Sequence, residues 1–259
     1  MGNVKCIWCR FYFAYLCKQC RFLNVGRGED EVQNLEVIYE DNHIIVVKKQ
    51  PNIPSQADKT EDVDMLTLIK QYIKEKYDKP GNVYLGLVHR LDRPVGGVMV
   101  FAKTSKAASR LSDQVREKIF KKKYLAVVDG KFESITGTLE DYLYKDERNN
   151  MSKVVNKDKK NAKLAKLDYE QLAYNELKKL SLVKVNLHTG RHHQIRVQLS
   201  HSGHSIFGDQ KYGTRGQGKQ IALWAYELTI QHPVTKEEMT FKCLPESNGT
   251  WCILRDIEI

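Results

Sequence analysis

Apolar residues in this chain fall mainly in short, strand-length runs that turn residues separate. Two of these runs flank Asp41 and Asn42 in the segment LEVIYEDNHIIVVKK, a pattern that predicts a hairpin. Further strands are predicted at 83–88, 98–102, 124–128 and, approximately, at 164–172 and 180–187. Strands grouped in hairpins with helices between them predict an α+β fold around a mixed, mostly antiparallel sheet flanked by helices and loops.

Two helices are predicted where a capping residue precedes apolar residues at helical spacing. Asp64 precedes the first helix and Thr104 precedes the second. The apolar positions are Met65, Leu68, Ile69, Tyr72 and Ile73 in the first, and Ala107, Ala108, Leu111 and Val115 in the second. One face of each helix is therefore expected to be buried.

The segment TGRHHQIRVQLSHSG has apolar spacing that fits both a strand and a helix. Thr189 as a start signal and Gly203 as a stop signal favour the helix. On such a helix His192, His193 and Arg196 lie within one turn and share a face.

The chain is predicted to divide into a leader, residues 1–34, and one globular domain, residues 35–259. The leader contains two Cys-x-x-Cys pairs and ends in a polar linker at 21–34. The four thiolates, which can bind a structural zinc ion, are those of Cys6, Cys9, Cys17 and Cys20. Only seven residues separate the pairs, which is tighter than in zinc ribbons, so a dispensable leader or a start codon assigned too early is the alternative.

Charge and hydropathy restrict the class of partner. The formal charge is +10, from 42 Lys and Arg against 32 Asp and Glu. Such a basic excess suits nucleic acid, since neutralising phosphates releases counterions. No apolar run reaches the roughly 18 residues of a membrane helix, and the apolar stretch Ile7 to Leu16 lacks a signal-peptide cleavage site. A cytoplasmic protein is expected.

A lysine- and asparagine-rich segment, residues 145–163, contains few large apolar groups. It predicts an exposed excursion or a mobile loop. Its lysines are either a solvated face or contacts to a nucleic-acid backbone.

The segment HRLDRPVGG places one carboxylate, Asp92, in a glycine-bearing loop between two predicted strands. Arg90 and Arg93 flank this carboxylate and favour its ionised form. A catalytic group on a rigid support has this placement, but so has an ordinary structural ion pair. A protein-kinase catalytic loop is excluded, because Leu91 interrupts the His-Arg-Asp sequence and no glycine-rich loop lies upstream.

Four motifs in a fixed order give this chain a resemblance to a known family. HRLDRPVGGVMVFAKT, with Asp92, resembles the catalytic signature of the RluA-type pseudouridine synthases. KKKYLAVVDG, with Tyr124, is similar to their second motif, and TGRHHQIR, continued by HSGHSIFGDQKYG, to their third. A weaker fourth match begins at Leu223-Trp224-Ala225 and continues to His232-Pro233. The resemblance covers most of residues 35–245.

The departures from the family pattern are few. Val95 and Gly96 stand where Thr and Ser are commoner, His192 replaces a common Thr, and Trp224 replaces a usual His. None of them removes a group that the chemistry requires. The accessory N-terminal RNA-binding domain of many members is not recognisable, and 34 residues are too few to hold it.

The resemblance implies the fold and reaction of a pseudouridine synthase, with a central RNA-binding cleft and no cofactor. Asp92 is then the catalytic carboxylate, Arg196 pairs with it, and Tyr124 packs against a target base that has left its stack. Residues expected to contact RNA are His89, Arg90, Arg93, Lys122, Lys123, Arg191, His193, Gln194 and Leu223. The implied partner is a stem-loop of ribosomal or transfer RNA, bound by a monomer.

Two alternatives come from other classes. A catalytically silent RNA-binding or assembly protein of the same fold would be expected to lack Asp92 or Arg196, and both are present. A zinc-dependent hydrolase would use the histidine cluster formed by His188, His192, His193, His201 and His204.

Overall fold

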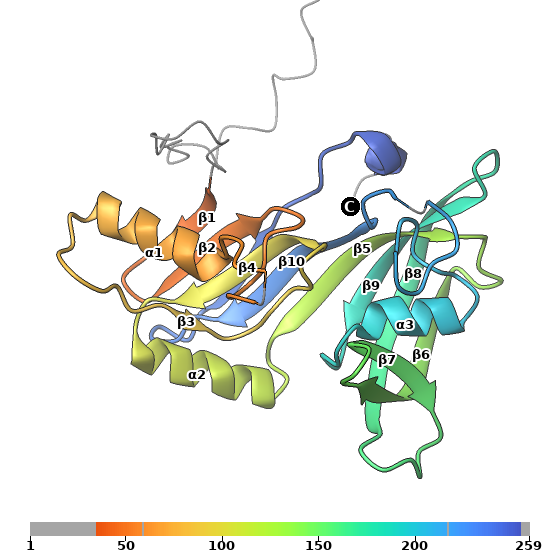
Figure 1. The fold of residues 1–259 in the computed structure, drawn as a ribbon, viewed down its shortest axis with the longest axis horizontal. Coiled ribbons are helices and arrows are strands. Elements are labelled where there is room, and N and C mark those ends of the chain that lie inside the picture. Colours follow the sequence, from red (N-terminus) through yellow and green to blue (C-terminus); the bar gives the residue numbers. More distant parts are fainter. Residues whose placement is uncertain (1–34, 59, 217, 255–259) are drawn as a thin grey trace, which may run out of the picture.

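The computed structural model describes residues 35–58, 60–216 and 218–254. Within these ranges the chain forms one eleven-stranded sheet, three α-helices and a short 3₁₀ helix (Figure 1). The strands are β1 (Glu36–Glu40), β2 (Ile44–Lys49), β3 (Gly86–Leu87), β4 (Gly96–Ala102), β5 (Lys121–Asp129), β6 (Thr136–Asp146), β7 (Met151–Val155), β8 (Lys163–Asn175), β9 (Leu180–Leu187), β10 (Leu223–Gln231) and β11 (Glu238–Lys242). The helices are α1 (Met65–Lys76), α2 (Ser105–Arg116), α3 (Gln194–His201) and the 3₁₀ helix (Gly249–Leu254). The cysteine-rich leader and its candidate zinc ligands lie outside the described residues.

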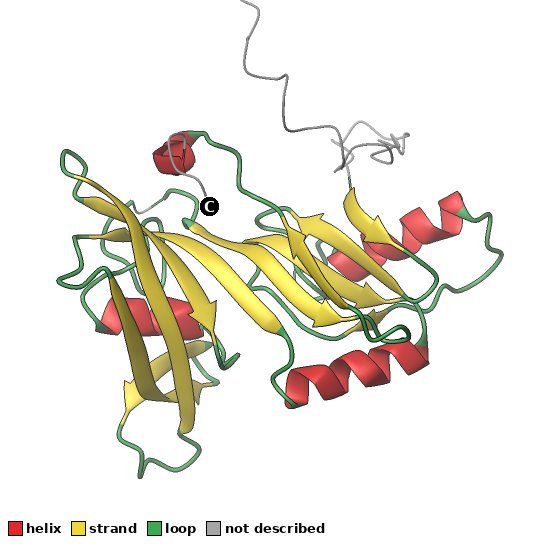
Figure 2. Cartoon of the chain, turned by 180° about the vertical axis from the view of Figure 1, so that it is seen from behind, coloured by secondary structure: helices red, strands yellow, loops and turns green. Residues whose placement is uncertain are grey.

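The strand order along the sheet is β1-β2-β4-β10-β5-β9-β8-β6-β7, with β3 beside β4 and β11 beside β10. Among these pairings β4 with β10 is parallel and the others are antiparallel. β1, β2 and β4 form one end of the molecule and β6, β7 and β8 the other, with β10 and β5 between them (Figures 1 and 2). The predicted α+β fold with a mixed, mostly antiparallel sheet is confirmed.

The helices α1 and α2 cover opposite faces of the β2–β4 end of the sheet. Ile45 of β2 belongs to the same core cluster as Ile69 of α1, whereas Ile44 packs with Leu111 of α2. Side chains alternate between the two faces of a strand, so covering both faces explains why β2 has a continuous apolar run. None of the helices in the described ranges is long and apolar enough to cross a membrane.

The predicted turn and helix caps are confirmed. Asp41 Oδ1 accepts hydrogen bonds from the backbone N–H groups of His43 and Ile44, both at 2.7 Å, in the β1–β2 turn. Asp64 caps α1 by accepting from the N–H of Leu66 at 2.7 Å, and Thr104 caps α2. Short polar side chains thus satisfy the first backbone donors of both helices.

Residues 145–163 are largely exposed, as predicted, but the alternative of a mobile loop is wrong, because part of the segment forms strands. β6 extends to Asp146, and β7 pairs with it antiparallel over Met151–Val155. The apolar residues of β7 do not alternate, so the strand is recognisable only through its partner. Leu143 and Ala165 pack against Val197 of α3. We call residues 136–166, which comprise β6, β7 and the start of β8, the arm.

The helix predicted from Thr189 begins five residues later, at Gln194, so the placement of His192 and His193 on it is wrong. His193 stands at the N-cap with φ of 52°, in the left-handed region, and Thr189 Oγ1 donates to Gln194 Oε1 at 2.8 Å. The segment before the helix therefore folds back onto its first turn. The predicted stop at Gly203 is confirmed, because Gly203 has φ of 85° just beyond the end of α3.

Candidate active site

Asp92 lies in the loop between β3 and β4, at the edge of a cavity. Its side chain is 30% exposed. Hydrogen bonds fix the backbone of this loop. Ser55 Oγ donates to Leu91 O at 2.8 Å and accepts from Leu91 N at 3.2 Å. Within the loop, Val95 N donates to Asp92 O at 2.9 Å. The carboxylate is therefore presented to solvent from a fixed backbone.

Lys49, at the end of β2, makes hydrogen bonds to the same loop. The residue is fully buried, and its Nζ donates to the carbonyl oxygens of Gln50, Arg93 and Val95 at 3.1, 2.9 and 2.6 Å. Three acceptors match the three N–H bonds of an ammonium group. Burial lowers the pKa of Lys49 to about 7, although Asp92 acts to raise it. Lys49 thus ties the end of β2 to the part of the loop that directly follows Asp92.

Arg196, on α3, links Asp92 to a second carboxylate. Its Nη1 lies 3.2 Å from Asp92 Oδ2, while its Nε and Nη2 donate to the two oxygens of Asp209 at 2.8 and 2.7 Å. Burial acts to raise the pKa of the fully buried Asp209, but the hydrogen bonds and charge of Arg196 outweigh burial and lower it. The bidentate pair fixes the guanidinium plane, and the remaining donor is directed at Asp92.

A hydrogen-bond chain connects the arm to His193, whose ring lies beside Asp92. Ser152 N of β7 donates to Tyr212 Oη at 2.7 Å, which leaves the Tyr212 hydroxyl proton for His193 Nδ1 at 2.9 Å. The ring proton of His193 is then on Nε2, 3.7 Å from Asp92 Oδ2. Burial lowers the pKa of His193 to about 3, even though Asp92 acts to raise it, so the ring is neutral near pH 7. His192 stacks on this ring with a centroid distance of 3.8 Å.

Tyr124 and Lys122 project from the same face of β5 into the site. Both line the cavity of about 580 Å³ beside Asp92. Tyr124 is 8% exposed, and burial together with the charge of Asp92 raises the pKa of its phenol, which keeps it protonated. Leu223, the first residue of β10, lines the same cavity. A planar ring can therefore be held between apolar groups and the Asp92 carboxylate.

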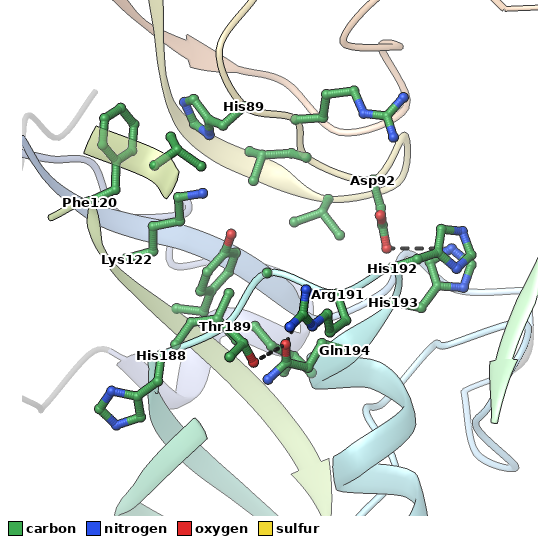
Figure 3. Close-up of a pocket in the computed structure, with 18 of the residues that line it drawn as sticks. His89, Asp92, Phe120, Lys122, His188, Thr189, Arg191, His192, His193 and Gln194 are labelled. Carbon is green, nitrogen blue, oxygen red and sulfur yellow. Dashed lines mark hydrogen bonds and ion pairs between the residues drawn. The ribbon is translucent and has the colours of Figure 1, made fainter. Parts of the chain in front are cut away.

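A second cavity, of about 590 Å³, lies on the other side of Asp92. The two cavities share Arg90, Leu91, Asp92, His192, His193 and Arg196. Figure 3 shows Asp92 beside His192 and His193 at one end of the first cavity, with Lys122 and Phe120 at the other. Asp92 thus stands between two spaces, each large enough for part of a polymer.

The structure brings most of the predicted site residues together. Those lining the first cavity are Asp92, Tyr124, Arg196, His89, Arg90, Lys122, Arg191, His193, Gln194 and Leu223. Arg93 lines the second cavity, where it is paired with Asp58 and Asp62. Lys123 lies on the opposite face of β5, and its ammonium is 2.8 Å from Glu227, so the structure does not bring it into the site.

Gln194 and Arg191 hold the loop before α3 in addition to lining the cavity. The Gln194 side-chain oxygen accepts from Arg191 N at 3.0 Å, and its amide donates to Lys166 O at 3.1 Å. Arg191 Nε donates to Leu164 O at 2.9 Å. These contacts fasten the loop to β8.

The histidines that the alternative of a zinc-dependent hydrolase would use do not form a metal site. No group of three or more His, Cys, Asp or Glu side chains in the described part of the chain is arranged to hold a metal ion. His188 instead lies 2.5 Å from Asp168, and His204 stacks on Phe132 with a centroid distance of 3.7 Å.

Sequence reasoning missed four residues that organise the site: Lys49, Ser152, Asp209 and Tyr212. Asp209 and Tyr212 belong to the segment HSGHSIFGDQKYG, which is part of the third motif, but no role followed from their spacing. Lys49 ends an apolar strand and looked like an ordinary boundary residue. Ser152 lies in the segment that was predicted to be a loop.

Comparison with known proteins gives a consistent result. A family model described as RNA pseudouridylate synthase matches residues 43–201. The RNA pseudouridine synthase YhcT of Bacillus subtilis is 32% identical over 211 residues, which cover 80% of this chain and 67% of the relative. The tRNA pseudouridine synthase C of Haemophilus influenzae is 30% identical, covering 80% of this chain and 91% of the relative. Human RNA Pseudouridylate Synthase Domain Containing 1 has the same fold, with a TM-score of 0.68, 24% identity and coverage of 85% and 87% of the two chains.

Proposed function

The chain belongs to the RNA pseudouridylate synthase family, whose members are isomerases that act on RNA, and on this premise we propose that Asp92 is the carboxylate with which it converts uridine to pseudouridine. The observation that carries the assignment is the position of Asp92. Its carboxylate is partly exposed at the edge of a cavity and lies 3.2 Å from the buried Arg196 guanidinium. A carboxylate paired with a fixed cation is held in one orientation.

The reaction rearranges bonds within one nucleotide. The C1′–N1 bond breaks, the uracil turns in place, C5 joins C1′, the proton on C5 is lost and N1 ends protonated. The electron count is unchanged, so we propose that no cofactor takes part. Asp92 acts either by attacking C1′ or as a base that produces a glycal intermediate, and the geometry is compatible with both.

Arg196 and His193 are proposed to position Asp92. Arg196 is anchored by Asp209, so its remaining donor is held toward the carboxylate. A neutral His193 adds a donor near Asp92 without a second positive charge. Because these groups are fixed before substrate binds, little reorganisation accompanies the reaction.

Tyr124 and Leu223 are proposed to hold the uracil. Both line the cavity beside Asp92, and the Tyr124 phenol remains protonated. A protonated phenol supports packing against the base more than removal of the C5 proton. The target nucleotide must leave its stack to enter this cavity.

The proposed substrate is a stem-loop of transfer or ribosomal RNA. The relative from Haemophilus influenzae is named for tRNA, and bases splayed out of loops are accessible to modifying enzymes, whereas paired bases are not. The formal charge of +10 supports contact with the RNA backbone.

The test uses total tRNA and total rRNA that carry tritium at C5 of uridine. Wild-type protein is expected to release tritium to water, and Asp92→Asn, which removes the charge and keeps the shape, is expected to reduce release by at least about 10³-fold, as for loss of an essential catalytic group. Asp78→Asn, at an exposed position just beyond α1, serves as the matched control. Equal release from wild type and Asp92→Asn would reject Asp92, and no release from folded wild type on either RNA would favour a silent RNA-binding protein.

A further inference from the structure

Three consecutive lysines on β5 have different surroundings. The ammonium of Lys121 lies 2.9 Å from Glu238 and that of Lys123 lies 2.8 Å from Glu227. Lys122 points to the other face of the strand, because side chains alternate along a strand. It lines the active-site cavity together with Tyr124, two residues further on.

Lys122 is the unpaired member of the three. Its Nζ has no hydrogen bond or ion pair with any residue in the described ranges, and it lies over the Phe120 ring, 5.6 Å from the ring centroid. Burial lowers the pKa of Lys122 to about 8, so the group is still mostly charged near pH 7. An unpaired, partly buried ammonium is costly in an empty cavity and becomes favourable when an anion enters.

A second donor lies at the same end of the cavity. His89 is 8% exposed, and its Nε2 accepts from Val100 N at 3.1 Å. The proton of the neutral ring is therefore on Nδ1, and this buried atom has no partner among the described residues. Figure 3 shows the His89 ring and the Lys122 side chain together, at the end of the cavity away from Asp92.

The rim of this end is basic as well. Lys118, just beyond α2, lines the cavity, and so does Arg116, whose guanidinium is also paired with Asp113. Asp92 is the sole carboxylate in the lining of this cavity. With its charge located at the opposite end, Asp92 does not neutralise Lys122. The local potential is thus positive where the cavity continues past the space assigned to the uracil.

We propose that Lys122 and His89 form a binding site for a backbone phosphate of the RNA, next to the target nucleotide. The proposal rests on the function proposed above and extends it to a neighbouring part of the substrate. Lys122 supplies the charge and His89 Nδ1 supplies a directed donor. The alternative anion is the uracil itself once the C1′–N1 bond has broken. A phosphate is favoured because several cations surround this end, as phosphate groups require.

Binding is measured with protein that carries Asp92→Asn, so that no turnover occurs, and with total tRNA and total rRNA as probes. Lys122→Gln is expected to weaken RNA binding about tenfold, as for loss of one charge-assisted contact. The slope of log affinity against log salt is expected to fall by about 0.7–0.9, the value of one phosphate contact. Lys122→Arg is expected to retain most of the affinity, and Lys121→Gln, with the same charge change on the other face, is the control.

Whether Lys122→Gln changes KM or kcat distinguishes a phosphate from the uracil anion. With Asp92 intact, a phosphate contact places the loss for Lys122→Gln mainly in KM. A loss confined to kcat, with unchanged RNA affinity, would overturn the proposal and assign Lys122 to the uracil anion. Equal weakening by Lys121→Gln and Lys122→Gln would also overturn it, since net charge alone would explain both. Lys122→Met, which keeps the apolar stem, replaces Lys122→Gln if the latter does not fold. Tritium release by wild type tests the isomerase function separately, so the two failures are distinguishable.

Discussion

At the scale of single residues, the site depends on how one guanidinium is divided between two carboxylates. Arg196 gives two hydrogen bonds to the fully buried Asp209 and one to the partly exposed Asp92. Asp209 therefore compensates the buried charge, and Asp92 remains available to a substrate. The Asp92–Arg196 pair was predicted from the motifs. Asp209 was not, because nothing in one sequence distinguishes a buried aspartate from the many exposed ones.

Asp209→Asn is expected to lower both stability and activity. Loss of one partner of a buried ion pair costs about 3 kcal/mol of the free energy of unfolding, and Arg196 also loses its anchor. The pKa of Asp209 is lowered in the folded protein, so its stabilisation is complete above about pH 4 and is lost as the pH falls below the unfolded value. Urea denaturation measures the free energy of unfolding of wild type and variant at pH 7 and at about pH 3.5. The difference between the two proteins is expected to be smaller at the lower pH.

The control for this prediction is Asp113→Asn, which removes an exposed pair with Arg116. It is expected to leave the denaturation midpoint nearly unchanged. If the two variants lost equal stability at pH 7, the special role of Asp209 would be contradicted.

At the scale of elements, close packing of β4 against β10 sets the position of the Asp92 loop. Gly97 pairs with Ala225 in the parallel register and has φ of 130°. A Cβ at Gly97 would lie 2.1 Å from Ala225 O, and one at Gly96 would lie 2.2 Å from the Trp224 ring. The first residues of β4, directly after the Asp92 loop, therefore admit only glycine.

Gly97→Ala is expected to destabilise the protein by about 3 kcal/mol, because backbone strain and overpacking act together. Gly81→Ala is the matched control: Gly81 also has positive φ, at 88°, but a Cβ there would meet nothing within 4 Å. Gly81→Ala is expected to lower the free energy of unfolding by only about 1 kcal/mol, from backbone strain alone. Thermal unfolding followed by circular dichroism measures both, and equal losses would show that the contact with β10 is unimportant.

Elements with a local signal were predicted well, and those that depend on a distant partner were not. The β1–β2 hairpin and the caps of α1 and α2 follow from turn and capping residues next to periodic apolar runs. The strand predicted at 83–88 is shorter in the structure, Gly86–Leu87, because only these residues pair with β4. β7 needs β6 to be recognised, and α3 starts late because the Gln194 side chain organises the preceding loop. The roles of Lys49 and Ser152 could not be predicted for the same reason, because their hydrogen-bond partners lie far away in the sequence.

At the scale of the whole molecule, the sheet joins a helix-covered end and an arm-bearing end across the active site. The lysines of the turn between β7 and β8, which are Lys157, Lys159 and Lys160, are exposed on the arm. α1, by contrast, lies at the opposite end of the molecule (Figure 1). Ser152 of the arm donates to Tyr212, which in turn contacts His193 beside Asp92. RNA bound along the arm would therefore lie close to the Asp92 site.

Replacing the three arm lysines by glutamine is expected to raise KM for RNA and to reduce the salt dependence of binding. If each lysine contacts one phosphate, the slope of log affinity against log salt falls by about 2–3. Filter binding at several salt concentrations measures the slope. The control replaces Lys70, Lys74 and Lys79, at or just after α1, by glutamine. The same change in slope from both triple variants would contradict a specific contact by the arm.

The position of β10 in the sheet has a consequence for biosynthesis. β10 inserts between β4 and β5, yet it is formed by residues 223–231, after every other strand except β11. While the ribosome still holds this segment, the facing edges of β4 and β5 have no partner, and such edges invite misassociation. The cavity also lacks Leu223 until then. A nascent chain is thus expected to be inactive until β10 has been made, and a premature stop before residue 223 would leave the two parts of the sheet unpaired with each other.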